Sequence, residues 1–444
     1  MKNEIKSFPI LFITILACGI FLYGCTGTIP KKNSKDNNYN NSVQSPNLTL
    51  SQDGAWCWYQ DPRAVYINGH HEKTYAQWMT SDGTLQIGSY DHKTQETITH
   101  TLKTNWDSDD HNVGSILVLP DNRLMVFYAR HGKVGLHCRT SVNPEDITQW
   151  EDEVTISNTN NISYNHPVYL SDEKLYYVFW RGPSWKPTFS TSKDGKIWSE
   201  PKILIQEAGR EAKTIRPYLK VVSDGKSSIH FTFTNGHPRN EPLNSVYYMK
   251  YENGKFFTAN GKQIGLMENL PVSHANSDIV YNGKLTGIRA WVWDIALDED
   301  GNPVIAYTRL PSETDHRYAY ARWTGKFWLD VEITPGGRWF PETPDGKNEF
   351  ESHYSGGISL VQSDPSSVYL SRMVDGQFEI EKWTTVDNGA SWSFLSITKK
   401  STQLNARPVS PRGYNGKNDY VLWMTGNYIH YTNYQTKIKM HLQQ

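Results

Sequence analysis

The chain has 444 residues, with 45 Lys and Arg against 46 Asp and Glu, so its formal net charge at pH 7 is −1. A near-neutral chain without a basic stripe does not fit a protein that follows a nucleic-acid backbone, and we expect no nucleic acid as a partner. Aromatic residues make up 13% and charged residues only 20%, which favours β structure and surfaces on which sugar rings can stack.

The N-terminus has the layout of an export signal. Two lysines among the first six residues precede an apolar run over residues 8–23, which is too short for a membrane-spanning helix. The run ends in Leu22-Tyr23-Gly24-Cys25, which resembles a bacterial lipobox, where the Cys is lipidated and becomes the new N-terminus. We therefore predict a lipoprotein signal peptide over residues 1–25, lipidation at Cys25, and a lipid-anchored protein in the cell envelope, at the outer membrane. Ordinary secretion with an unmodified Cys25 is the alternative.

Residues 26–50 are rich in Asn, Ser, Lys and Pro and are predicted to be a flexible tether, so the folded domain is expected over residues 51–444, as a monomer. Two cysteines, Cys57 and Cys138, fall within that domain, and a disulfide between them is left open. No CxxC pair indicates a structural zinc site. Asp-rich turns allow structural calcium, although no twelve-residue calcium loop is present.

One pattern recurs seven times along the predicted domain: a turn of Asp, Asn or Gly followed by a short apolar and aromatic strand. The strands of the seven copies cover residues 74–78, 124–128, 175–180, 229–233, 304–307, 368–370 and 420–423. They begin about 50 to 75 residues apart, which leaves room for four short antiparallel strands in each repeat. One such sheet cannot bury both of its faces, whereas a ring of sheets can. We therefore predict an all-β fold, a seven-bladed β-propeller, closed by a strand near residues 56–66 that pairs with strands near residues 420–440.

Two segments match the Asp-box turn of sialidase-like propellers, Ser/Thr-x-Asp-x-Gly-x-x-Trp. Residues 385–392 match it in full, and residues 192–198 match it with one residue fewer. In this turn the Asp side chain binds nearby backbone amides and the Trp packs beneath. The motif supports the fold and indicates nothing about catalysis.

Unusual polar residues stand where strands of two consecutive blades begin or end. His111, within an Asp-Asp-His-Asn run, precedes a strand, and His131 follows the next one. Tyr164 precedes the strands of the following blade, and Arg181 ends one of them. We expect these four side chains to converge at one end of the propeller axis.

These residue types suit the removal of a weakly acidic proton beside a carboxylate, such as the C5 proton of a uronic acid. Its removal builds a dianion unless the carboxylate is neutralised, which a forked and always charged Arg does well. A neutral His or a Tyr phenolate can take the proton, and a Tyr phenol or an imidazolium can protonate the leaving oxygen at C4. Nearby positive charge is expected to lower the Tyr pKa and make the phenolate accessible. No cofactor or metal is required, and the expected partner is an acidic polysaccharide or oligosaccharide, with sulfate as a further allowed group.

Other polar residues follow strands of later blades. Arg216, His237 and Arg239 are predicted to bind carboxylate or sulfate on the substrate, with solvent-exposed loop residues as the alternative interpretation. His353-Tyr354 and Arg372 are interpreted as structural residues that derive from the repeat.

Four longer segments point to one known family. They are Trp56-Cys57-Trp58-Tyr59-Gln60-Asp61-Pro62-Arg63-Ala64-Val65, Asp109-Asp110-His111-Asn112, Phe179-Trp180-Arg181-Gly182 and Arg216-Pro217-Tyr218. Together they resemble the BNR-repeat-like family of seven-bladed propellers, which includes ulvan lyases, rhamnose–glucuronate lyases and a group of α-L-rhamnosidases. The resemblance extends over roughly residues 51–440.

The resemblance implies β-elimination in which His111 and Tyr164 handle the proton transfers, while Arg181 and His131 hold and neutralise the carboxylate. The sequence does not decide which of His111 and Tyr164 is the base. The related rhamnosidases carry a His in the first of the four segments, on the opposite face of the propeller. Gln60 stands at that place here, and a Gln cannot serve as a general base, which argues against hydrolysis.

The predicted function is that of a carbon–oxygen lyase that acts across C4–C5 of a uronate in ulvan-type or rhamnose–glucuronate glycans. Elimination does not depend on whether a sugar or a hydroxyl leaves from C4. A chain-cleaving polysaccharide lyase and an oligosaccharide dehydratase are therefore both open. The alternatives are an α-L-rhamnosidase-type hydrolase and a non-catalytic glycan-binding lipoprotein.

Overall fold

The computed structural model describes residues 47–206, 216–338 and 354–443, which belong to one compact unit over residues 45–444. The predicted signal peptide, Cys25 and the tether up to residue 46 lie outside the described residues, and the lipid anchor stays a prediction. Within the described part, no helix is both long and apolar enough to cross a membrane.

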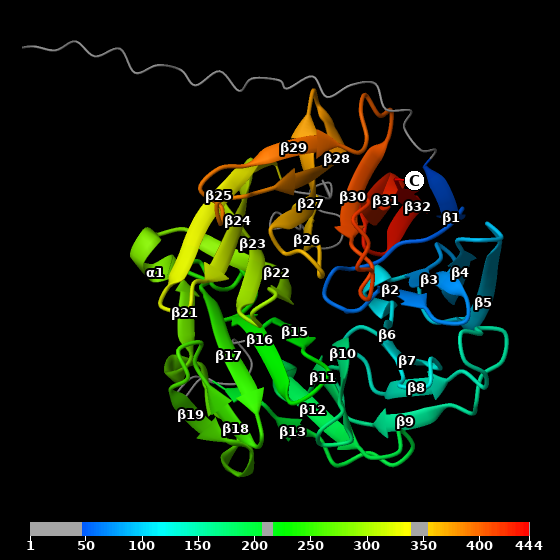
Figure 1. The fold of residues 1–444 in the computed structure, drawn as a ribbon, viewed down its shortest axis with the longest axis horizontal. Coiled ribbons are helices and arrows are strands. Elements are labelled where there is room, and N and C mark those ends of the chain that lie inside the picture. The colour runs from blue at the N-terminus through cyan, green and yellow to red at the C-terminus, as the bar shows by residue number, and fades with distance from the viewer. Residues whose placement is uncertain (1–46, 207–215, 339–353, 444) are drawn as a thin grey trace, which may run out of the picture. The chain divides into compact units, whose positions relative to one another are not determined.

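The described residues form seven antiparallel sheets arranged in a ring, which confirms the predicted all-β, seven-bladed propeller (Figure 1). The first three blades contain β2 (Ala64–Asn68), β3 (Glu72–Met79), β4 (Leu85–Asp91) and β5 (Thr97–Lys103); β6 (Ser115–Val118), β7 (Leu124–Ala129), β8 (Leu136–Thr140) and β9 (Val154–Ser157); and β10 (Ser163–Leu170), β11 (Leu175–Arg181), β12 (Pro187–Ser192) and β13 (Lys202–Ile203).

The fourth blade is the largest, because its sheet has six strands where each of the other blades has four. It contains β15 (Leu219–Ser223), β16 (Ser228–Thr234), β17 (Val246–Glu252), β18 (Lys255–Phe257) and β19 (Gln263–Leu266), with β21 (Asp278–Tyr281) paired to β17. Beside it, a short parallel pair is formed by β14 (Ile205–Gln206) and β20 (Val272–Ser273), and the helix α1 (Gly283–Thr286) follows β21.

The remaining blades complete the ring. The strands are β22 (Arg289–Leu297), β23 (Pro303–Ser312), β24 (Asp315–Trp323) and β25 (Trp328–Gly337) in the fifth blade; β26 (Ile358–Leu360), β27 (Ser367–Val374), β28 (Gln377–Thr384) and β29 (Ser393–Ser396) in the sixth; and β30 (Leu404–Val409), β31 (Tyr420–His430), β32 (Asn433–Leu442) and β1 (Leu48–Ser51) in the seventh.

All seven repeat strands of the sequence are the second strands of their blades. They fall in β3, β7, β11, β16, β23, β27 and β31. A second strand has a strand on either side and is covered on both faces, so its sequence is a continuous apolar run. Accordingly, every residue of β7 and of β16 is buried. The first strands lie nearer the axis, where those of neighbouring blades lie against one another.

The ring is closed by a strand that lies closer to the N-terminus than predicted. β1 pairs antiparallel with β32 and completes the seventh blade. The expected closure through residues 56–66 is therefore wrong in its residues, and the propeller begins at Leu48, inside the predicted tether.

Residues 55–63, called the axial segment below, fill the centre of the ring instead. Carbonyls of this segment accept hydrogen bonds from Arg407 in the seventh blade, at 2.7 Å, and from Lys220 in the fourth, at 2.5 Å. One of its amides donates to the carbonyl of Asp110, before the second blade, at 3.1 Å. Trp58 is fully buried there. Contacts with blades on different sides of the ring place the axial segment on the propeller axis, where it supports the strand ends around it.

The two Asp-box segments form the expected turns. Asp387 accepts a hydrogen bond from the amide of Ser391 at 2.8 Å, and Asp194 accepts one from the amide of Lys196 at 2.8 Å. The two cysteines of the domain are buried and unpaired, so the disulfide left open by the sequence is not formed.

Candidate functional site

His111 is held by a single 3₁₀ turn, Asp110–Asn112, that leads toward β6. Asp109 caps this turn, and its Oδ1 accepts hydrogen bonds from the His111 amide at 2.9 Å and from Nδ1 of the His111 ring at 2.8 Å. Oδ1 of Asp110 lies 3.0 Å from the same Nδ1. The two carboxylates fix the ring, so only Nε2 is left to face the centre of the site.

Asp109 also orients the second imidazole. Its Oδ2 lies 3.2 Å from Nδ1 of His131, which follows β7. The His111 and His131 rings stack with their centroids 4.4 Å apart and their planes 13° from parallel. The His111 side chain is only 2% exposed, whereas that of His131 is 24% exposed. His131 is therefore the imidazole that solvent or a ligand reaches directly.

Tyr164 reaches His131 because the backbone at the start of β10 is distorted. The φ angle of Tyr164 is +61°, a left-handed conformation that is costly for a bulky residue. The register between β10 and β11 shifts at the same place, between Ser163 and His166. The phenolic oxygen of Tyr164 lies 3.4 Å from Nε2 of His131. Strain at this position is consistent with a functional constraint on the side chain.

Arg181, at the end of β11, is a buried cation surrounded by aromatic rings. Its guanidinium lies 4.5 Å from the ring centroid of Tyr164 and 4.6 Å from that of Trp185. It donates to the Tyr218 hydroxyl at 2.7 Å and lies 3.3 Å from Nε2 of His131. Among the described residues no carboxylate pairs with Arg181, its Nε has no hydrogen-bond partner, and the residue is only 5% exposed. A buried guanidinium without a counter-ion is a ready binding site for an anion.

The two imidazoles are driven to different protonation states. Burial alone lowers the pKa of His111, but the acidic groups around it, the Cys57 thiol first and the Asp109 carboxylate among them, raise it well above its ordinary value. Burial lowers the pKa of His131 to about 4, and the charge of His111 adds to the decrease while Asp109 opposes it. At neutral pH, His111 is an imidazolium and His131 a neutral imidazole. Titratable groups with separated pKa values identify acid and base roles.

Tyr164 is a phenol in the free protein. Burial raises its pKa well above 10, and the charges of Arg181 and His111 offset only part of that increase. The expectation that nearby positive charge gives an accessible phenolate is wrong for this state. The physical reason is that Tyr164 packs against the rings of Tyr59 and Tyr218, with centroids 4.9 and 5.6 Å away, so that desolvation outweighs the guanidinium.

A buried ion pair holds the 3₁₀ turn that carries His111. Arg407, fully buried in β30, pairs with Asp110, and the Tyr428 hydroxyl donates to the same carboxylate. Gln60 of the axial segment is also fully buried, and its amide donates to the His111 carbonyl. Gln60 therefore positions the His111 backbone, rather than facing a binding surface at the opposite end of the propeller.

The three predicted flanking residues lie beside the cluster on the fourth-blade side. Arg216 stacks 4.6 Å from the centroid of Trp185, the ring that also contacts Arg181. The His237 ring lies 5.6 Å from that of Tyr218. Burial lowers the pKa of Arg239, and nearby phenols, that of Tyr354 first, oppose the decrease. Arg216 and His237 thus contact rings that surround Arg181, and a role of the three residues in substrate binding stays a prediction.

Sequence reasoning missed several contributors. The repeat pattern indicates only a structural role for Tyr354, but its hydroxyl lies 3.4 Å from Nε2 of His111. Tyr431 packs edge-on against His111 at 4.8 Å. Tyr354 and Tyr431 come from blades far along the chain, so no local sequence pattern connects them with His111. Asp109 and His111, in contrast, are two residues apart, and this spacing is a signal from which their contact could be predicted. Arg372 pairs with Glu381 at 2.6 Å, as a structural residue would, and His353 lies outside the described residues.

Among the residues that the structure describes, two sets of side chains bring three metal-ligating atoms within 4.8 Å of one another: Cys57, Asp110 and His111, and Asp109, His111 and His131. In both sets Nδ1 of His111 already contacts carboxylate oxygens. The arrangement is explained by hydrogen bonds between an imidazolium and carboxylates. Structural calcium stays a prediction.

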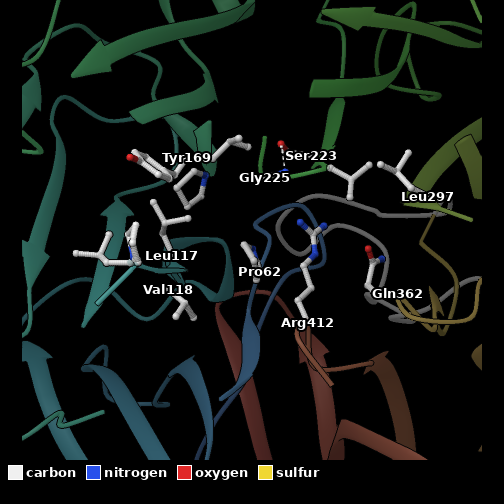
Figure 2. A pocket seen from close by; sticks show the side chains of 14 residues that line it. Pro62, Leu117, Val118, Tyr169, Ser223, Gly225, Leu297, Gln362 and Arg412 are labelled. Carbon is white, nitrogen blue, oxygen red and sulfur yellow. Dashed lines mark hydrogen bonds between the residues drawn. The ribbon is translucent and has the colours of Figure 1, made fainter. Parts of the chain in front are cut away.

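A separate pocket of about 480 Å³ lies at the opposite end of the axis. Figure 2 shows the side chains that line it. Tyr164 is near the start of β10, whereas Tyr169, which lines this pocket, is near its end. The lining side chains are mostly apolar, Arg412 is the only charged one, and none of the described lining residues is His, Asp or Glu. The described lining residues thus include no pair of carboxyl groups of the kind that most glycoside hydrolases use.

Comparison with known proteins agrees with this architecture. A PL25 ulvan lyase structure has 17% sequence identity and a TM-score of 0.66, and the match covers 89% of this chain and 96% of that one. A PL25 ulvan lyase structure bound to -[GlcA(1-4)Rha3S]- has 16% identity, the same coverage of both chains and a TM-score of 0.66. The polysaccharide lyase Uly1 has 12% identity and a TM-score of 0.54, over 89% of this chain and 97% of that one.

At these identities the likeness establishes the propeller fold. No curated protein matches the sequence. Residues 73–335, more than half of the chain, match the profile of BNR repeat-containing family members. The chain therefore belongs to the BNR repeat-containing family.

Proposed function

We propose that the protein is a carbon–oxygen lyase that eliminates the C4 substituent of a uronic acid in ulvan-type or rhamnose–glucuronate glycans. The observation that carries the proposal is the buried guanidinium of Arg181, which has no carboxylate partner among the described residues and lies beside a neutral imidazole and a phenol. The likeness to ulvan lyases, one of them described with a GlcA–Rha3S glycan, supports an acidic and sulfated substrate.

In the proposed reaction, the substrate carboxylate binds Arg181 and neutralises its charge. The loss of that positive field raises the proton affinity of His131. The Tyr164 oxygen then takes the C5 proton while its own proton passes to Nε2 of His131, 3.4 Å away. Asp109 holds Nδ1 of His131 and stabilises the imidazolium that forms, as the carboxylate of a catalytic triad does.

The electron pair of the broken C5–H bond forms the C4–C5 double bond, and the C4–O bond breaks. The leaving oxygen needs a proton, and His111 is the group that carries one at neutral pH. Its Nε2 faces the Tyr354 hydroxyl at 3.4 Å, so Tyr354 is placed to pass the proton outward. The proposal thus assigns the role of general base to Tyr164, which passes its own proton to His131, and the role of general acid to His111.

The same residues serve whether the C4 substituent is a sugar or a hydroxyl. Incubation with defined ulvan oligomers, followed by ultraviolet absorbance and mass spectrometry, separates the outcomes. An unsaturated uronate with shorter chains identifies a polysaccharide lyase, and an unsaturated uronate with loss of one water and no scission identifies a dehydratase. Free rhamnose without an unsaturated product would identify a hydrolase, and binding without any product would identify a glycan-binding protein.

A further inference from the structure

We infer that a groove between the sixth and seventh blades binds an uncharged sugar unit of the same glycan. This inference rests on the proposed function and extends it, because it requires a substrate chain that continues beyond the reacting uronate. The groove has a volume of about 520 Å³ and is bounded by the end of β27, the start of β28, the start of β30 and the end of β31, which are neighbours in the ring (Figure 1).

The groove lies at the same end of the propeller as the candidate site. Tyr428 lines it, and the Tyr428 hydroxyl donates to Asp110, whose carboxylate contacts the His111 ring. Three residues further along the same chain segment, Tyr431 packs against His111 and, with centroids 6.1 Å apart, against His131. One short stretch of chain therefore joins the groove to the imidazole pair, and a glycan held at Arg181 can extend over it.

The chemistry of the groove fits a neutral sugar. Its polar side chains are mainly uncharged, and Gln403 and Asn427 are exposed amides whose side chains make no hydrogen bond within the described residues. An amide both donates and accepts, as sugar hydroxyls require. Ile429 and Met373 add apolar surface for the face of a sugar ring. Among the described lining residues Arg338 is the only charged one, whereas the amides offer the donors and acceptors that an uncharged sugar needs.

The test uses the full protein with Gln403 and Asn427 both changed to Ala. Loss of both amides removes their hydrogen bonds to the sugar, so kcat/KM on long oligosaccharides should fall roughly tenfold, while kcat/KM on the shortest substrate that is turned over stays unchanged. The matched control is Asn415→Ala, another exposed amide of the seventh blade, which lies before the start of β31 and should leave both values unchanged. Equal effects on long and short substrates, or no effect on either, would overturn the inference.

Calorimetric titration separates this inference from the proposed function. If the wild-type protein forms no unsaturated uronate from any glycan, the proposed function fails. The groove is then judged by binding alone. Weaker binding of long chains in the double variant, with binding of short chains unchanged, would support the groove, and equal binding by the variant and the wild type would refute it. Absence of any binding by the wild type would also refute it.

Discussion

Replacement of Asp109 by Asn tests the arrangement of the imidazole pair with little change in shape. In the structure one carboxylate oxygen accepts from the amide and the ring of His111, at 2.9 and 2.8 Å, and the other faces Nδ1 of His131 at 3.2 Å. An Asn can keep the first oxygen, but it then presents an NH₂ group to His131. Two hydrogen-bond donors, the NH₂ group and an Nδ1–H, cannot bond to each other. The His131 ring must therefore take the tautomer with its proton on Nε2.

That tautomer blocks the proposed proton transfer, because Nε2 of His131 is the atom that must accept the proton of Tyr164. Removing one partner of a buried charged pair costs about 3–5 kcal/mol, and each 1.36 kcal/mol of activation free energy changes the rate tenfold. We therefore expect kcat to fall by roughly 10² to 10⁴, with KM nearly unchanged, since Asp109 lies behind the imidazoles. The assay is the initial rate of formation of the unsaturated uronate by ultraviolet absorbance.

Asp107→Asn is the matched control. The Asp107 side chain is 57% exposed, and its contact with Arg130 is long, at 3.7 Å, so this variant should keep wild-type activity. Circular dichroism and thermal unfolding would establish that both variants are folded. If folded Asp109→Asn kept kcat within a few-fold of the wild type, the relay from Tyr164 through His131 to Asp109 would be refuted.

Four further expectations follow. Tyr164→Phe removes one hydroxyl and should reduce kcat at least on the order of a hundredfold in the same assay, and near-normal turnover would exclude Tyr164 as an acid or base. Arg181→Lys keeps the charge but loses the fork, so kcat/KM should fall about ten- to a hundredfold, mainly through KM, and an unchanged KM would place the substrate carboxylate elsewhere. Because burial lowers the pKa of His131 to about 4, the NMR signal of His131 should titrate only as the pH falls through about 4, and activity should be lost in that range; a His131 signal that titrates near 6.5 would contradict this. Trp58→Ala replaces a fully buried side chain of the axial segment, opens a cavity, and should lower the free energy of unfolding by about 3–5 kcal/mol in denaturant titrations, whereas a loss below about 1 kcal/mol would mean that the axial segment is not a core element.

The fold could be predicted because every blade has to bury its second strand on both faces. A second strand that is covered on both faces must be apolar throughout, so the seven apolar runs indicate seven blades, and each run is the second strand of its blade. The closing strand could not be identified in the same way. Leu48–Ser51 has only four residues and adjoins a polar stretch, and what fixes it is its pairing with β32 near the other end of the chain.

The candidate site was predictable only in its local part. The four predicted residues lie on two consecutive blades: His111, His131, Tyr164 and Arg181. Because neighbouring blades in the chain are also neighbours in the ring, their convergence could be predicted from the sequence. Tyr354, in contrast, lies 243 residues from His111 in sequence, and only closure of the ring brings it to the imidazole. Protonation states were equally out of reach, because the raised pKa of Tyr164 comes from burial among rings of other segments.

The central claim is that one uronate binds Arg181 and loses its C5 proton to Tyr164. It is tested most directly with ulvan oligomers deuterated at C5 of the uronate, with the ultraviolet absorbance of the product followed for the wild type and for Tyr164→Phe. The account predicts an unsaturated product that has lost the C5 deuterium, a slower reaction than with the undeuterated substrate, and little or no product from the variant. A product that keeps the deuterium, or equal rates for the wild type and the variant, would contradict it.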